Sequence, residues 1–278
     1  MKTLLTGARI IDPAQKIDAV MDILFEDGKI IKTGHDLIKP AKSRDTGKIK
    51  IIKLDGLLLT PGLIDIHTHL REPGMEYKET IASGSKAAVV GGFTSIACMP
   101  NTDPVNDNRS ITEFIKKKAA EADLANVYPI GAISKSSAGT QLTEFWDLKE
   151  AGVVAFSDDG KPVMDAALMR HAMEYAYSLD LPVISHCEDI NLSVGGQMNE
   201  GYYSTILGMR GIPSIAEEAM VARDILIAEF TETRVHIAHV STAGSIRLIR
   251  EAKKRGLKVT AETAPHYFTL TDESLQAY

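Results

Sequence analysis

Hydrophobic and polar positions follow two different patterns along the 278 residues of the chain. Up to about residue 60, short apolar β-type runs are separated by turn residues, and Asp27-Gly28 stands between two of them as a tight hairpin turn would. From Pro61 onward, short apolar runs alternate with amphipathic helical segments. We therefore predict a small β module over residues 1–60 and an α/β unit over residues 61–278.

The second region contains seven short apolar runs with a helical segment between each consecutive pair. Such alternation predicts parallel strands, and a long unbroken series favours a (β/α)8 TIM-type barrel. An open doubly wound sheet would usually carry a Gly-rich phosphate turn after its first strand, which is not found here. The seven predicted strands span residues 62–70, 93–101, 126–134, 152–160, 181–189, 234–242 and 257–266.

Helix boundaries can be predicted at three places in this region. Ser110 and Ser214 are each followed by Glu three residues later, which indicates a capping box, and Gly256 follows an amphipathic run as a helix stop. No eighth strand is recognised before Tyr278, so only seven of the eight strands of a barrel are accounted for. We therefore expect a truncated sequence or fragment, with two strand edges left open.

Composition and charge exclude several classes of function. The formal net charge of −6 offers no basic field for a nucleic-acid backbone. The first twenty residues do not form a secretory signal, and no stretch is apolar enough to span a membrane, so we expect a cytoplasmic protein. Cys98 and Cys187 lie far apart within apolar runs, and we interpret them as reduced core thiols.

Candidate chemistry begins with the segment DIHTHLREPG. Alternation along a strand places His67, His69 and Arg71 on one face. In barrels of this kind, catalytic groups collect at the carboxyl ends of strands. The polar residues at these ends include Asn101, Asp158, Asp159, His186 and His239. Imidazoles and a carboxylate together form a ligand set suited to zinc or a similar divalent ion.

Each of these residues also has a structural interpretation. A single His at a strand end is more often a hydrogen-bonded structural residue, and an Asp-Asp-Gly sequence is more often a plain turn. We interpret His236 as packing toward the helices or the barrel floor, and His266 as a residue that could line the pocket without binding metal.

Seven segments together resemble a known family. In order, they are DIHTHLREPG, CMPNT, FSDDG, SHCED, MNEGYYSTILGMRGIPSIAEE, AHVSTAGS and ETAPHYF. They are similar to bacterial class I dihydroorotases of the amidohydrolase superfamily. The resemblance implies the reversible conversion of N-carbamoyl-L-aspartate to L-dihydroorotate in pyrimidine (UMP) biosynthesis. It also implies that the N-terminal β module is half of a composite β domain.

The resemblance further implies the roles of individual residues. Two zinc ions per active site would be bridged by Asp159 and a hydroxide, although strand alternation alone does not choose between Asp158 and Asp159. A catalytic general acid/base Asp would lie on strand eight, beyond Tyr278, so we expect this chain alone to be inactive. The other assigned residues are His67 and His69 for the first zinc, His186 and His239 for the second, and Arg71 and Asn101 for the substrate carboxylate, with His69 also assigned to substrate binding.

Alternative functions remain open at this point. Arg71 favours a substrate with a carboxylate, whereas hydantoinases and allantoinases act on rings without it. Many of these enzymes use a carboxylated Lys on strand four, but we interpret Lys161 as a loop residue. A non-catalytic, dihydroorotase-like partner of aspartate transcarbamoylase is a further possibility. The resemblance also implies a homo-oligomer and a possible association with aspartate transcarbamoylase.

Overall fold

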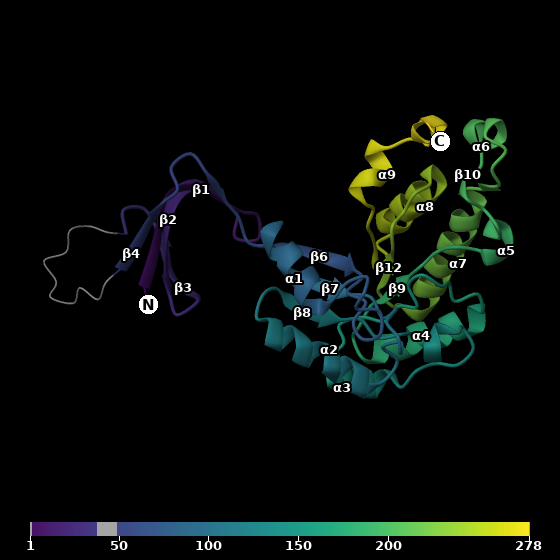
Figure 1. Ribbon diagram of the computed structural model, residues 1–278. Helices are drawn as coiled ribbons and strands as arrows, with labels where there is room; N and C mark the ends of the chain where they lie inside the picture. Colours follow the sequence, from purple (N-terminus) through teal and green to yellow (C-terminus); the bar gives the residue numbers. More distant parts are fainter. Residues whose placement is uncertain (1, 38–48, 278) are drawn as a thin grey trace, which may run out of the picture. The chain divides into compact units, whose positions relative to one another are not determined.

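The computed structural model describes residues 2–37 and 49–277. Contacts between residues divide the chain into two compact units, Met1–Leu63 and Ile64–Tyr278, which are drawn in purple to blue and in blue to yellow in Figure 1. The division falls close to the change of hydrophobic pattern in the sequence. That the first unit is half of a composite domain stays a prediction.

Over residues 2–37 and 49–63, the first unit forms a five-stranded sheet. The central strand β1 pairs with β2 in antiparallel fashion and with β4 and β5 in parallel fashion, and β3 is added next to β2. The predicted hairpin turn is confirmed, because Asp27 and Gly28 join β2 to β3 with φ values of 47° and 78°, both positive as a type I′ turn requires. The strands are β1 (Lys2–Asp12), β2 (Ile17–Glu26), β3 (Lys29–Gly34), β4 (Ile49–Lys53) and β5 (Leu58–Leu59).

The second unit alternates strands with helices, as the pattern predicts (Figure 1). Its described strands form two three-stranded sheets in the orders β6-β7-β8 and β9-β12-β13, and one two-stranded sheet, β10-β11. Strand β8 runs parallel to β7, and β9, β12 and β13 are parallel to one another. The strands are β6 (Leu63–Thr68), β7 (Phe93–Cys98), β8 (Asn126–Pro129), β9 (Val183–Ser185), β12 (Val235–Ile237) and β13 (Val259–Ala261), and the separate short pair is β10 (Met198–Asn199) and β11 (Gly211–Ile212).

The strand predicted over residues 152–160 is wrong as a full strand. Only Phe156 forms bridges there, to Gly131 and to Val183, so this segment joins the two sheets through one residue. The amides of Val154 and Phe156 donate to the carbonyls of Pro129 and Pro182. Because a proline has no backbone N–H, neither proline can donate a hydrogen bond to this segment, and the strand pairing is interrupted. The parallel order β6-β7-β8-Phe156-β9-β12-β13 is nevertheless continuous.

Helices fill the connections between these strands. The capping prediction at Ser110 is wrong, because Asn108 is the N-cap of α2 and its side chain accepts from the amides of Ser110 and Ile111. Gly256 ends α8 with φ +82°, as predicted. The helices are α1 (Ile81–Val90), α2 (Arg109–Ala122), α3 (Phe145–Ala151), α4 (Ala166–Ser178), α5 (Ile190–Ser193), α6 (Tyr202–Ile206), α7 (Ile215–Thr231), α8 (Ala243–Lys254) and α9 (Pro265–Thr269), with 3-10 turns at Lys135–Ser137 and Asp272–Ala277.

A second predicted capping box also fails. Ser214 is the N-cap of α7, but its backbone is helical and its side chain makes no capping bond. The carboxylate of Glu217 accepts instead from the backbone amides and hydroxyls of Ser241 and Thr242, at 2.7–3.0 Å. Glu217 thereby fixes the loop that follows β12 rather than its own helix start.

The hydrophobic core of the second unit lies on both sides of the strands. A smaller cluster, half of it alanine, lies among the strands, and a larger cluster packs against the helices. Cys98 and Cys187 are buried and free, as expected. Among the described residues, no helix is both long and apolar enough to cross a membrane. The smaller cluster comprises Ala97, Met99, Ile130, Ala155, Ile184 and Ala238.

Candidate metal centre

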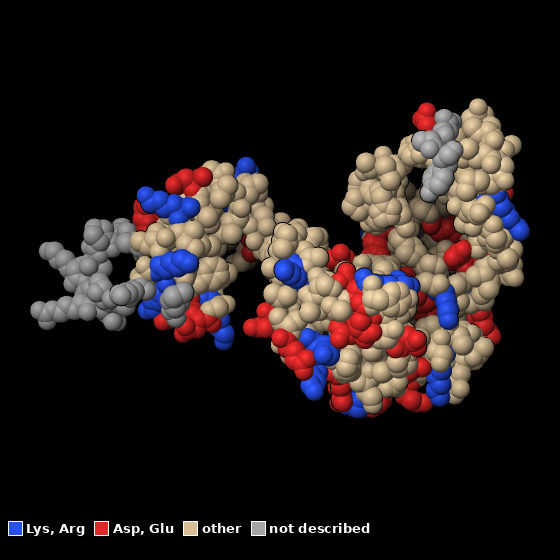
Figure 2. Space-filling model, in the orientation of Figure 1, with Lys and Arg blue, Asp and Glu red and all other residues tan. Residues whose placement is uncertain are grey.

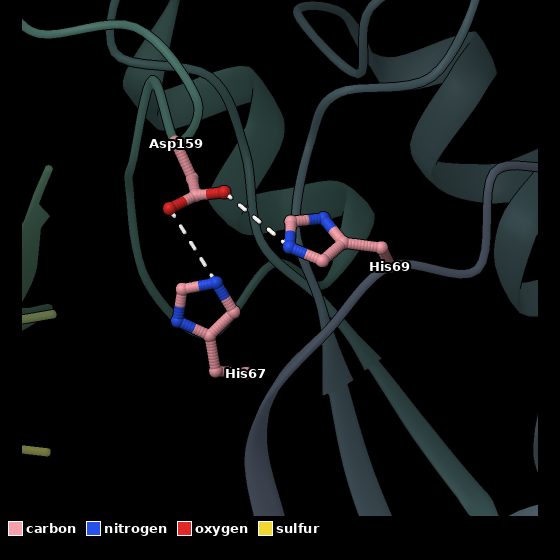
Figure 3. Close-up of side chains that lie close together, drawn as sticks. All are labelled: His67, His69 and Asp159. Carbon is pink, nitrogen blue, oxygen red and sulfur yellow. Dashed lines mark ion pairs between the residues drawn. The ribbon is translucent and has the colours of Figure 1, made fainter. Parts of the chain in front are cut away.

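Five residues from four strand ends converge in the second unit. His67 lies in β6 and His69 directly beyond it, and Figure 3 shows both imidazoles pointing toward the carboxylate of Asp159. Asp159 follows the Phe156 bridge, and its side chain is only 4% exposed. His186 follows β9 and His239 follows β12. The structure therefore brings together all five residues that the resemblance assigns to metal.

The carboxylate of Asp159 is shared by the four imidazoles. Its Oδ1 lies 3.4 Å from Nε2 of His67, 3.6 Å from Nδ1 of His186 and 3.5 Å from Nε2 of His239. Its Oδ2 lies 3.6 Å from Nε2 of His69. Although Oδ1 is buried, no hydrogen-bond partner satisfies it. A buried carboxylate oxygen facing several nitrogens without hydrogen bonds is what a cation between them would satisfy.

Two groups of three residues could each hold a metal ion, and Asp159 belongs to both. One group is His67, His69 and Asp159; the other is Asp159, His186 and His239. Within each group the ligand atoms lie within 4.8 Å of one another. Imidazole nitrogens and a carboxylate oxygen suit zinc or a similar divalent ion. The residues present therefore fit a pair of metal ions with a shared carboxylate.

Three of the histidines contact a polar partner through the nitrogen that faces away from Asp159. His67 Nδ1 is hydrogen-bonded to Glu262, and His69 Nδ1 lies 3.0 Å from Oδ1 of Asn101. His186 Nε2 lies 3.2 Å from Glu188. A metal-binding imidazole commonly donates its other N–H to such an acceptor, which fixes the ring and its tautomer. These contacts direct the remaining nitrogen of each ring toward Asp159, although Nδ1 of His186 also lies 2.8 Å from Nε2 of His239.

Electrostatics differ between neighbouring members of the cluster. Burial opposes ionisation of Asp159, but the contacts with His186, His239 and His67 hold its pKa well below the ordinary value. Burial alone would lower the pKa of His67, yet its contacts with Asp159 and Glu262 raise that pKa to about 9. For His69 the burial effect prevails, and its pKa is lowered. Without metal, Asp159 is therefore an anion paired with a protonated His67.

Asp158 has a different environment from its neighbour. Its Oδ1 accepts from the amide of Ser134 at 2.9 Å, and Oδ2 accepts from the hydroxyl of the same residue. The residue is 3% exposed, and burial raises its pKa. Asp158 thus fixes the loop after β8, while Asp159 faces the histidines. The structure distinguishes the two acids where strand alternation could not.

Arg71 and Asn101 lie beside the cluster. Nη1 of Arg71 donates to the carbonyl of Asn101 at 3.2 Å, and the Asn101 side-chain amide donates to the carbonyl of Asp159 at 3.3 Å. Asn101 also supports His69, a role that the sequence did not indicate. Lys161 is an exposed residue of the loop after Asp159.

His266, the last of the predicted site residues in the sequence, is not part of the cluster. His266 is exposed on α9, where its ring packs against Tyr267 at 4.5 Å between centroids. A cavity of about 280 Å³ beside His186 and His239 is lined by Tyr267, and His266 is not among its lining residues. A role for His266 in the pocket stays a prediction that this geometry does not favour.

Two carboxylates and one histidine around the site were missed or misread in the sequence. Glu262 and Glu188 contact metal-facing imidazoles; Glu262 directly follows β13, but its position after a strand is by itself no distinctive signal. His236, interpreted as packing toward the helices or the barrel floor, makes its polar contacts with β13 and the residue after it rather than with a helix. Its Nδ1 is hydrogen-bonded to the Thr260 hydroxyl at 2.8 Å, and its Nε2 lies 3.5 Å from Glu262. Residue 236 pairs with residue 260 across the strands, which directs this ring toward the neighbouring strand end.

Comparison with known sequences assigns the family. The sequence model of the dihydro-orotase-like family matches residues 56–245. The chain belongs to this family. It is 62% identical over 275 residues to a dihydroorotase of Syntrophus aciditrophicus, covering 99% of the chain and 63% of that relative. It is 55% identical over 278 residues to a dihydroorotase of Geobacter sulfurreducens, covering 100% of the chain and 64% of that relative.

The family assignment confirms the resemblance seen in the sequence, but the match covers only part of each relative's length. The chain of this dihydro-orotase-like protein spans 63–64% of the length of these curated relatives. Solved structures with a similar fold include an L-hydantoinase from Arthrobacter aurescens, with a TM-score of 0.82, 20% identity, and coverage of 99% of the chain and 61% of that protein. A D-hydantoinase matches with a TM-score of 0.80, 22% identity, and coverage of 100% and 60%. At this identity the likeness shows the fold alone.

Proposed function

We propose that the protein to which this chain belongs is a dihydroorotase, which interconverts N-carbamoyl-L-aspartate and L-dihydroorotate in pyrimidine biosynthesis. Its relatives at 62% and 55% identity bear that name. The observation that carries the proposal is the convergence of two histidine pairs on Asp159, with Arg71 and Asn101 beside them. We also propose a (β/α)8 barrel for the whole protein and a cytoplasmic location.

The ligand set suits two zinc ions. His67 and His69 would hold the first, His186 and His239 the second, and Asp159 would contribute to both. When bound, such a pair activates a water for attack on the ring amide and polarises its carbonyl oxygen. The low pKa of Asp159 keeps its carboxylate ionised at any pH at which the histidines could bind metal.

Arg71 is proposed to bind the substrate carboxylate. A guanidinium carries five N–H groups and can pair a carboxylate through two parallel hydrogen bonds. One Arg71 nitrogen donates to the Asn101 carbonyl, which holds the side chain next to the cluster. The Asn101 amide is itself directed toward Asp159. Proton transfer at the ring nitrogen requires a separate acid/base group, for which we propose the Asp that the resemblance places beyond Tyr278.

Turnover tests this proposal directly. We expect hydrolysis of L-dihydroorotate by the zinc-loaded parent protein, with hydantoin and allantoin as comparison substrates. Arg71→Ala should lower kcat/KM by about 100-fold, because it removes a charged partner of a buried carboxylate. Arg247→Ala is the matched control, since Arg247 is exposed on α8. Preferred turnover of hydantoin or allantoin, unaffected by Arg71→Ala, would contradict the proposal.

Two alternatives are separated by the same assay. A hydantoinase or allantoinase is supported only by the fold likeness to hydantoinases. A non-catalytic partner of aspartate transcarbamoylase would bind no dihydroorotate productively, and the presence of all five ligand residues argues against it. Association with that enzyme and homo-oligomerisation stay predictions, as does the inactivity of the 278 residues when assayed alone.

A further inference from the structure

A carboxylate outside both ligand groups lies directly behind the cluster. Glu262 is the first residue after β13, and its side chain is 16% exposed. Its Oε1 is hydrogen-bonded to Nδ1 of His67, on the opposite side of that ring from Asp159. Within the part of the chain that the structure describes, Glu262 belongs to neither group that could hold a metal, and it reaches the site through its hydrogen bond to His67.

An imidazole can bind metal only through a nitrogen that carries no proton. An acceptor on Nδ1 keeps a proton there, so the metal binds at Nε2. In His67 this nitrogen lies 3.4 Å from Oδ1 of Asp159. The hydrogen bond also fixes the rotation of the ring, so Nε2 points at the shared carboxylate rather than past it.

Glu262 is itself held in place from two directions. Its backbone amide donates to the Ile237 carbonyl at 3.1 Å, and its carbonyl accepts from the Val240 amide at 2.8 Å, which ties it to the end of β12. Its Oε2 lies 3.5 Å from Nε2 of His236, whose other nitrogen is hydrogen-bonded to Thr260. A carboxylate fixed on both backbone and side chain can hold an imidazole in one orientation.

We infer that Glu262 is a positioning residue, which orients His67 for the first metal ion without touching that ion. The inference rests on the proposed two-metal site and adds to it the residue that prepares one ligand. Glu188 contacts His186 in a similar way, but its side chain is 38% exposed, so its hold on the ring is weaker.

Zinc affinity tests the inference without any assay of turnover. Zinc is titrated into the metal-free protein in competition with a chromophoric chelator, for the wild type, Glu262→Ala and Glu262→Gln. We expect Glu262→Ala to lower the affinity for one of the two zinc ions by about 10- to 100-fold and to leave the affinity for the other unchanged. Glu262→Gln, which still accepts a hydrogen bond but lacks the charge, should recover part of the loss. Glu251→Ala, at an exposed position of α8, is the control.

Wild-type affinity for both zinc ions in Glu262→Ala would overturn the inference. If that variant does not fold, ¹⁵N-histidine NMR of the zinc-loaded wild type decides, with His67 assigned by the signal missing in His67→Gln. A proton on Nδ1 of His67 supports the inference, and a proton on Nε2 overturns it. A zinc-loaded parent protein that binds two zinc ions but hydrolyses no dihydroorotate would refute the proposed function and leave the role of Glu262 intact.

Discussion

The two histidine pairs that meet at Asp159 are built in different ways. His67 and His69 are two residues apart at the end of one strand, so strand alternation alone places them on a common face. His186 and His239 come from β9 and β12, which are neighbours in the sheet but 53 residues apart in sequence. The first pair is therefore a local property of the chain, whereas the second requires the register between two strands.

The surroundings of the two pairs differ as well. His67 and His69 each have a partner within the fold, Glu262 and Asn101, whereas His186 contacts the more exposed Glu188. The facing nitrogens of His186 and His239 lie only 2.8 Å apart. What unites the pairs is one carboxylate, since Asp159 lies beside all four rings. The comparison teaches that each half-site has its own supporting contacts, whereas both depend on the same carboxylate.

Asp159→Asn gives the largest expected effect. The amide keeps the shape of the side chain but removes the charge that offsets the cations of both half-sites. We expect both zinc affinities to fall by more than about 100-fold, since loss of an outer partner alone costs about 10- to 100-fold. Metal content after dialysis, measured by atomic spectroscopy, should drop from two zinc ions per chain to almost none.

His186→Ala is the control that sharpens this result. It removes a ligand of one half-site only, so the variant should retain the zinc held by His67, His69 and Asp159. One zinc per chain in His186→Ala, with almost none in Asp159→Asn, would establish Asp159 as the shared ligand. Complete loss of metal in His186→Ala would show that the half-sites do not bind independently.

Most of the fold of the second unit could be predicted because its signals are periodic. Alternating strands and helices were recognised from apolar runs, and Gly256 behaved as its backbone preference requires, as did the Asp27-Gly28 turn of the first unit. The strand over residues 152–160 was overestimated because the opposing prolines Pro129 and Pro182 are distant in sequence. The cap at Ser110 failed because Asn108, two residues earlier, is an equally good capping residue.

The candidate site was predictable to the extent that its residues lie at strand ends. The choice between Asp158 and Asp159 was not, because it depends on a contact with Ser134 in another loop. Glu262 was missed for a related reason. A single Glu after a strand has no distinctive spacing, and its importance arises only when β13 pairs with β12 and approaches His67.

The proton released when zinc binds to the first half-site offers a second test, and its expected effect is of intermediate size. In the metal-free protein the pKa of His67 is raised to about 9, while that of His69 is lowered. Below pH 9 His67 is therefore protonated, and zinc must displace a proton from its Nε2, whereas His69 has none to lose near pH 7. Affinity for the first zinc should rise with pH, by up to about tenfold per unit, and level off above pH 9.

Isothermal titration calorimetry checks this expectation. The apparent enthalpy of zinc binding at pH 7 should vary with the ionisation enthalpy of the buffer, because the buffer takes up the released proton. His186→Ala isolates the first half-site and removes the contribution of the second. A binding enthalpy independent of buffer in that variant would contradict a protonated His67 and, with it, the difference between the two neighbouring histidines.

The smallest expected effect is on protein stability, and it distinguishes Asp158 from Asp159, whose substitution is expected to change metal binding. Asp158→Ala removes the acceptor of the buried Ser134 amide and should lower the free energy of unfolding by about 1–3 kcal/mol, measured by urea denaturation. Zinc content should remain two per chain, since Asp158 belongs to neither ligand group. If Asp158→Ala lost zinc without losing stability, Asp158 rather than Asp159 would be the metal ligand. The expected result assigns one acid to the loop after β8 and leaves its neighbour, pointing the other way, to the metals.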